Sequence, residues 1–148
     1  VPALTEGEMA LACKLDDELP EGWSIAVQRK LNNAVPDVLC FHPLHGIIVF
    51  EVKDWDPEAR ELWVRDANVW ARNIGSNTEY VTDDPAGQVM HYKDMLAETF
   101  PRFTDAEIMI TAVVVLTNFS DEAANKLLGG LRPSVYRTKS RHPRNALS

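Results

Sequence analysis

Two carboxylates and one amine, at Asp37, Glu51 and Lys53, lie in or beside two neighbouring apolar segments of the sequence. Carboxylate oxygens are the protein ligands that Mg²⁺ prefers. A metal ion held in this way makes hydroxide from water near neutral pH and stabilises charge on a phosphate, while a nearby lysine can position the nucleophile. These residue types therefore indicate a divalent-metal site, provided that the fold brings the three side chains together.

The segments around these residues predict a β-hairpin with strands at residues 35–41 and 47–53. If the turn centres on Leu44, paired residues have numbers that sum to 88, and Asp37 lies opposite Glu51 with Cβ atoms about 4.5 to 5.5 Å apart. Lys53, two residues further on, shares that face. A slip of one residue would move the partner to the other face, so the metal site depends on this register.

Two facing carboxylates among apolar neighbours should repel each other, which predicts a raised pKa for at least one of them. Lys53 supplies one compensating charge, and a divalent metal ion would supply the rest. The alternative is that Glu51 and Lys53 lie on a solvent-exposed face and that Asp37 pairs with an arginine.

The rest of the chain supplies elements that could support this hairpin. Apolar periodicity, capping residues and Pro or Gly breaks predict helices at residues 5–19, 83–100 and 120–128 and strands at 23–27 and 108–116. Residues 54–82 are less periodic, although Leu62, Val64, Val69 and Trp70 could form an extra hairpin. The order of helix, three strands, helix, strand and helix predicts an α/β fold with a central mixed sheet flanked by helices.

Composition limits the class of protein. The chain of 148 residues is 45% hydrophobic and 25% charged, which is enough apolar material for one compact core. Its net charge of -7 argues against a protein that simply coats DNA, because such binding needs clustered Lys and Arg against the phosphates. A bound Mg²⁺ would supply positive charge where a phosphate sits, so the acidity does not exclude a nuclease.

A basic segment without acidic residues follows Gly129, and its cations are Arg132, Arg137, Lys139, Arg141 and Arg144. We expect a domain over residues 1–128 and a basic tail or linker over 129–148. This segment either contacts phosphates or is a solvated link to a further domain.

The sequence shows neither a membrane span nor a secretory signal. No run approaches the ~18 to 20 apolar residues that a span requires, which predicts a cytoplasmic protein that does not contact a membrane. Cys13 and Cys40 are far apart, and we expect both to be buried as small apolar residues.

Four motifs stand out together: Glu6-Gly7-Glu8, Pro36-Asp37-Val38-Leu39, Gly46 to Lys53, and Asp84-Pro85 followed by Gln88. They resemble those of the NERD (nuclease-related) domain of the PD-(D/E)XK superfamily, which has a restriction-endonuclease-like core. The resemblance extends from Glu6 to about Leu116. Residues 54–82 and those after Leu116 show little that aligns.

This resemblance implies roles for individual residues. Asp37, Glu51 and the backbone carbonyl of Val52 would bind Mg²⁺ or Mn²⁺, and Lys53 would orient or activate water. Gln88 and Glu8 would complete the site, with Glu8 a further metal ligand. The spacing of Gln88 and Tyr92 also resembles a motif of RecB-like nucleases, and His91, on the same side of the helix as Gln88, could touch DNA. On sequence alone, Gln88 and His91 could equally be exposed helix residues.

The implied activity is magnesium-dependent hydrolysis of DNA, as an endonuclease or exonuclease in DNA processing or repair. Related domains are often fused to helicases or kinases, so a fused or associated helicase is an expected partner. The alternative is a non-catalytic adaptor that binds nucleic acid or protein and keeps only the fold.

Other candidate residues indicate weaker hypotheses. Cys40, His42 and His45 could suggest zinc, but Cys40 is expected on the face opposite Asp37 and the histidines are expected in a turn. The side chains of Trp55, Trp63 and Trp70 could stack on bases or pack in the core.

Overall fold

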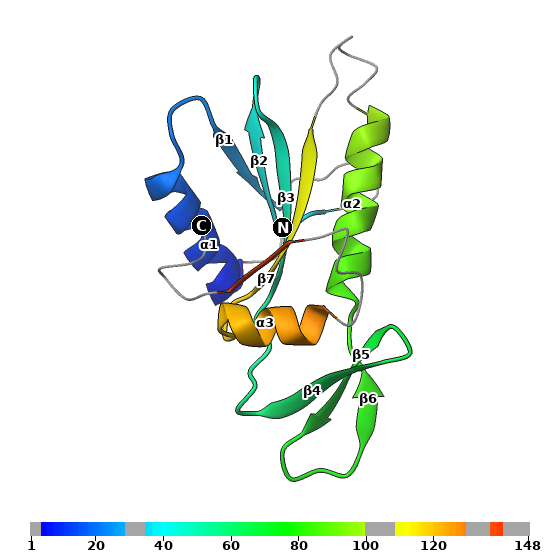
Figure 1. Cartoon of the computed structure of the whole chain (residues 1–148). Helices are drawn as coiled ribbons and strands as arrows, with labels where there is room; N and C mark the ends of the chain where they lie inside the picture. The colour runs from blue at the N-terminus through cyan, green and yellow to red at the C-terminus, as the bar shows by residue number, and fades with distance from the viewer. Residues whose placement is uncertain (1–3, 29–34, 100–108, 130–136, 141–148) are drawn as a thin grey trace.

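The computed structural model describes residues 4–28, 35–99, 109–129 and 137–140, and it has an α/β fold with a mixed sheet (Figure 1). Within these residues, β1 and β2 pair antiparallel, as do β2 and β3, whereas β7 is parallel to both β3 and β8. The strands lie in the order β1 (Ser24–Val27), β2 (Val38–His42), β3 (Gly46–Lys53), β7 (Ile110–Leu116) and β8 (Arg137–Ser140).

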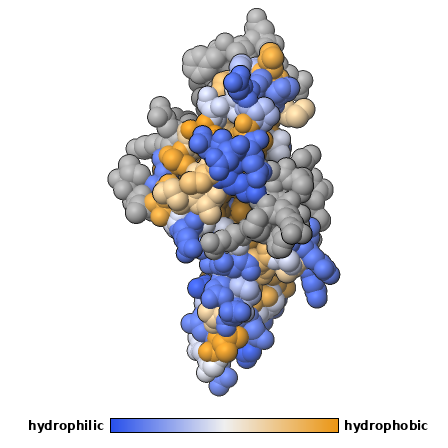
Figure 2. Space-filling model, turned by 90° about the vertical axis from the view of Figure 1, so that its left-hand side faces the viewer, coloured by the Kyte–Doolittle hydropathy of each residue, from blue (hydrophilic) through white to orange (hydrophobic). Residues whose placement is uncertain are grey.

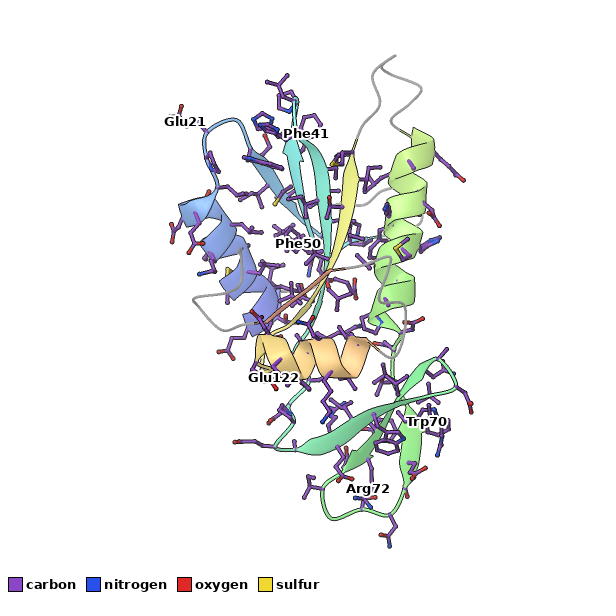
Figure 3. The ribbon with its side chains drawn as sticks, viewed as in Figure 1. Glu21, Phe41, Phe50, Trp70, Arg72 and Glu122 are labelled. Carbon is purple, nitrogen blue, oxygen red and sulfur yellow. The ribbon has the colours of Figure 1, made fainter. Side chains whose placement is uncertain are left out.

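Helices cover both faces of the main sheet. Helix α1 (Glu6–Glu18) packs on one face, where Leu11 and Leu15 meet Phe50. Helices α2 (Pro85–Thr99) and α3 (Asp121–Leu128) pack on the other face. Figure 3 shows Phe50 between the sheet and α1. The predicted arrangement of a central mixed sheet between helices is therefore confirmed.

The hairpin of β2 and β3 has the predicted register. Val38 pairs with Phe50 and His42 with Gly46, so paired numbers sum to 88. Strand β2 begins at Val38 rather than at Val35, because Pro36 has no N–H to donate and cannot extend the ladder.

The side chains of β3 point alternately into two hydrophobic cores, one on each face of the main sheet. Val49 belongs to the core beneath α2 and α3, whereas Phe50 belongs to the core beneath α1. Side chains two residues apart share a face of a strand, so Glu51 and Lys53 lie on the α2 side of the sheet.

A second, three-stranded sheet lies between β3 and α2 in the sequence and projects from the end of the main body (Figure 1). Its strands are β4 (Arg60–Arg65), β5 (Asn68–Asn73) and β6 (Glu79–Val81). The extra hairpin predicted from Leu62, Val64, Val69 and Trp70 is confirmed as β4 and β5, but β6 was not predicted. Figure 2, seen from the α1 side, shows this projection at the lower end, with a mainly hydrophilic surface.

Two further features differ from the expectations. Arg137–Ser140, within the expected basic tail, forms β8 beside β7, and residues 130–136 and 141–148 of that segment lie outside the described residues. Cys40 is buried as expected, but Cys13 is exposed on α1, so that expectation was wrong. No helix among the described residues is long and apolar enough to cross a membrane.

Gly7 allows α1 to approach the ends of β3 and β7 closely. Its N–H donates to Asp54 Oδ2 at 3.1 Å, and Asp54 also accepts a hydrogen bond from Thr117 Oγ1. A Cβ atom on Gly7 would lie 1.8 Å from Asp54 Oδ1 and 2.6 Å from Thr117 Cγ2. The N-terminus of α1 is therefore fixed to the sheet by a contact that only glycine permits.

We predict that Gly7→Ala lowers the free energy of unfolding by about 1 to 3 kcal/mol, because the added methyl group overpacks this contact. Helix propensity alone would favour alanine by about 1 kcal/mol. Urea unfolding measures the change, with Ala10→Gly at an exposed position of α1 as the control for propensity. A Gly7→Ala variant more stable than the wild type would contradict this account.

Candidate active site

Asp37 lies directly before β2 and is bonded to β3. Its Oδ2 accepts a hydrogen bond from the backbone N–H of Val52 at 2.7 Å. Extending the observed register by one residue places Asp37 opposite Glu51, which is only 4% exposed. The two carboxylates therefore meet at the end of the hairpin.

Lys53 lies between two carboxylates. Its Nζ is 3.3 Å from Glu51 Oε1 and 3.0 Å from Asp83 Oδ2. Sequence reasoning named Asp83 only as part of a helix start, since nothing in the spacing relates residue 83 to residue 53. Because Glu51 is buried and the Lys53 side chain is 14% exposed, the alternative of a solvent-exposed pair is excluded.

The first turns of α2 border this group. Asp84 caps the helix as predicted, since its Oδ1 accepts from the N–H of Gly87 at 2.9 Å. Tyr92 is half-buried and His91 is exposed. An open cleft of about 640 Å³ runs along this surface and is lined by Val35, Asp83, Asp84, Gly87, Gln88, His91 and Tyr92.

Glu8 approaches the group from α1. It is 6% exposed, and its Oε2 accepts a hydrogen bond from Gln28 Nε2 at 3.3 Å. Gln28 also donates its backbone N–H to the carbonyl of Asp37 at 3.0 Å, which ties the end of β1 to the site. Sequence reasoning missed Gln28, because its approach to Asp37 and Glu8 depends on tertiary structure.

Burial and charge raise the pKa of both carboxyl groups. Burial, followed by the charge of Asp37, raises the pKa of Glu51 from 4.5 to about 7, with Lys53 opposing the shift. Burial also raises the pKa of Asp37, with Glu8 adding to the shift and the Val52 N–H opposing it. The predicted rise is confirmed, but burial contributes more to it than repulsion.

The charges of the same carboxylates also shift the pKa values of Lys53 and Tyr92. Burial alone would lower the pKa of Lys53, but Glu51 and Asp83 outweigh burial and raise it. Burial raises the pKa of Tyr92 to about 12, and the charges of Glu51 and Asp37 add to this effect. Lys53 therefore stays charged and Tyr92 stays neutral near neutral pH.

The donor set fits a hard divalent cation. Glu51 Oε2 is buried and has no hydrogen-bond partner among the described residues, and Gln88 Oε1 is in the same situation. A buried, ionised oxygen without a partner is costly unless a cation binds it. The described residues contain no group of three or more His, Cys, Asp or Glu side chains placed to hold a metal, so side chains alone would supply only part of a coordination sphere.

The weaker candidates lie elsewhere. Cys40 is buried on the α1 side of the sheet, as expected, and burial raises its pKa to about 12. His42 and His45 form a ring cluster with Trp23 at the turn of the hairpin, at the opposite end from Asp37. Trp55 is in the core, whereas Trp63 and Trp70 are half-buried in the small sheet.

The fold is an α/β fold whose neighbours among solved structures are restriction-endonuclease-like. Residues 3–117 match the family described as the nuclease-related domain, NERD, and the chain therefore belongs to the NERD family. No curated protein matches the chain.

Two solved structures are similar to this chain. A repair endonuclease from Pyrococcus abyssi has a TM-score of 0.51 at 17% identity, over 97% of this chain and 50% of that one. A structure described as an EndoMS-dsDNA2 complex has a TM-score of 0.47 at 15% identity, over 97% of this chain and 47% of that one. The chain thus spans about half the length of these proteins.

The raised pKa of Glu51 predicts how stability without metal depends on pH. The folded chain holds a proton that the unfolded chain has lost, so stability falls as pH rises from 4.5 to about 7. A shift of this size corresponds to at most about 3 kcal/mol. Glu51→Gln imitates the protonated form and should be the more stable protein at pH 8, while the two should be equal near pH 4. Urea unfolding in EDTA at several pH values measures both curves, and parallel curves would show that Glu51 titrates normally.

Proposed function

We propose that this domain is a metal-dependent nuclease that hydrolyses phosphodiester bonds in DNA, with Asp37, Glu51 and Lys53 as its central residues. The observation that carries this proposal is the buried Glu51 carboxylate, whose Oε2 has no partner among the described residues and which lies beside the half-buried carboxylate of Asp37. Two such groups contribute little to stability, since apolar side chains of the same volume could replace them at a lower cost in folding free energy. Their presence supports a role in binding a cation.

Asp37 and Glu51 would hold Mg²⁺ or Mn²⁺ together with the backbone carbonyl of Val52, and Glu8, whose charge raises the pKa of Asp37, would lie beside these ligands. When bound, the metal would make hydroxide available near neutral pH and would neutralise charge on the phosphate. The hydrogen bond from the Val52 N–H fixes Asp37 Oδ2, which orients the carboxylate before any ligand arrives.

Lys53 would act as a fixed cation. Its raised pKa keeps it protonated, so it cannot take a proton from water near neutral pH. Its ammonium group can instead donate hydrogen bonds to a phosphate oxygen and stabilise negative charge there. Asp83 holds the ammonium group at 3.0 Å and would keep it in place when Glu51 binds metal.

Residues of α2 would contact the substrate beside the metal. Gln88 has a buried Oε1 without a partner among the described residues, which could accept a hydrogen bond from the attacking water. Tyr92 and the exposed His91 line the adjoining cleft and would contact the DNA strand. The neutral hydroxyl of Tyr92 can donate a hydrogen bond without repelling a phosphate.

The repair endonuclease that shares this fold supports a role in DNA processing or repair. A fused or associated helicase, or another DNA-processing domain, would be the expected partner of such a nuclease. An adaptor without catalysis would need no buried, unpartnered carboxylate, so the observation above favours the enzyme.

Divalent ions should stabilise the fold in a pH-dependent way. A metal ion that binds only the folded state at 100 times its Kd adds about 2.7 kcal/mol. Since protons compete for Glu51, the rise in melting temperature with millimolar Mn²⁺ should be larger at pH 8 than at pH 5.5. Asp37→Asn should lose the rise, and Glu122→Gln, at an exposed position on α3, should keep it. Equal rises in all three proteins would indicate unspecific binding.

Two substitutions should separate catalysis from DNA binding. Asp37→Asn keeps an oxygen that can accept from the Val52 N–H but removes a charge, so cleavage should fall at least about a hundredfold while DNA affinity stays similar or rises. Lys53→Ala should reduce cleavage as strongly but weaken DNA binding slightly, because it deletes a cation. Plasmid and single-stranded DNA with Mg²⁺ or Mn²⁺ serve as substrates, and binding is measured with Ca²⁺.

The adaptor alternative makes the opposite prediction for the wild type. A folded domain that binds DNA but cuts no substrate with any divalent ion would overturn the proposed nuclease activity.

A further inference from the structure

A second pocket lies away from the carboxylates, at the junction of the small sheet with the main body. Its volume is about 390 Å³, and its walls are Pro57, Arg60, Glu61, Leu62, Trp63 and Phe119. Phe119 follows β7 and packs against the main core, while Arg60 to Trp63 belong to β4. The pocket is thus lined by two aromatic residues and an arginine.

Arg60 is the unusual member of this pocket. Its Nε is buried and has no hydrogen-bond partner among the described residues, and Arg60 forms no ion pair with them. The other two arginines of the small sheet are satisfied, since Arg65 pairs with Glu79 and Arg72 with Glu61. A buried N–H of a charged group costs free energy unless an acceptor binds it.

The neighbouring carboxylate does not satisfy Arg60. Glu61 lines the same pocket, but its Oε2 is bound by Arg72 Nη2. This ion pair neutralises Glu61 and leaves Arg60 as the cation available to a ligand. An anion is therefore the natural complement of the polar side of the pocket.

Trp63 and Phe119 form the other side. Both rings are half-buried, so part of each ring remains accessible. Aromatic residues together with an arginine are suited to bind a nucleotide. Its phosphate would accept hydrogen bonds from the guanidinium group, and its base would stack on an aromatic ring. A pocket of about 390 Å³ has room for such a group.

We propose that this pocket binds an unpaired nucleotide of the DNA strand on which the domain acts. The identity of the strand rests on the proposed function, whereas the anionic and aromatic character of the ligand rests on the pocket. The small sheet is inserted between Lys53 and Gln88, so it projects from the end of the main sheet where the carboxylates lie (Figure 1). A strand that leaves the candidate active site would thus meet a second point of attachment.

The test uses the Arg60 Nε–H resonance in ¹⁵N NMR spectra of the whole chain, recorded in EDTA so that no metal and no cleavage are involved. The probes are inorganic phosphate, thymidine monophosphate and a short oligothymidylate. We expect the oligonucleotide to shift this resonance to saturation, with the mononucleotide shifting the same signal at higher concentration. No shift with the oligonucleotide would overturn the proposal.

The affinity of variants for oligothymidylate provides a second test of the same proposal. Arg60→Gln and Trp63→Leu should each weaken oligothymidylate binding about tenfold, because each removes one charged hydrogen bond or one stacking contact. Arg60→Gln should also lower the slope of log K against log salt concentration by about 0.7, and Trp63→Leu should leave it unchanged. Arg65→Gln, a more exposed cation of the same sheet that is already paired, is the matched control and should have little effect. Equal losses at Arg65 and Arg60 would indicate unspecific attraction and overturn the proposal.

The outcomes separate this inference from the proposed function. A shifted Arg60 signal in a chain that never cleaves DNA would support the nucleotide site and contradict the nuclease activity. Cleavage of DNA by a chain whose Arg60 signal does not respond would support the nuclease activity and contradict the nucleotide site.

Discussion

The burial of Glu51 beside a second carboxylate, that of the half-buried Asp37, is the constraint on which the site depends. Glu51 continues the face of β3 that packs beneath α2, so its position in the strand forces it into a nearly dry environment. Asp37 is held against it by the Val52 N–H. Burial raises the pKa of both groups, and Lys53 provides only partial compensation. A divalent cation bound by both carboxylates would offset their repulsion.

The surrounding elements serve to bring other groups to this point. Helix α1 approaches closely because Gly7 has no side chain, and this approach carries Glu8 towards Asp37. The cap at Asp84 fixes the start of α2, which places Tyr92 near Glu51 and Gln88 beside Tyr92 in the wall of the cleft. The loop before α2 is tied to the small sheet, since Thr82 donates both its N–H and its hydroxyl to the carbonyl of Val69. Asp83 is consequently held within reach of Lys53.

Local sequence patterns predicted those features of the fold that depend on interactions between residues close in the sequence. The register of β2 and β3 followed from a short turn and alternating apolar residues, and the start of α2 followed from Asp84 and Pro85. Contacts made by polar residues across long sequence separations could not be predicted. Asp83 and Gln28 reach the site only through tertiary structure, and nothing in their types or spacing distinguishes them. The strands β6 and β8 were missed because their short sequences, Glu79–Val81 and Arg137–Ser140, show no alternation of apolar and polar residues.

The central claim is that the carboxylates of Asp37 and Glu51 bind a divalent ion, and paramagnetic broadening tests it most directly. Mn²⁺ added below stoichiometric amounts should broaden the backbone amide resonances of Glu51 and Val52 first, because broadening depends steeply on distance to the ion. The resonance of Leu44, in the turn at the other end of the hairpin, should stay sharp. Broadening that begins instead at the exposed acidic residues Asp16, Asp17 and Glu18 of α1, with Glu51 unaffected, would contradict the account.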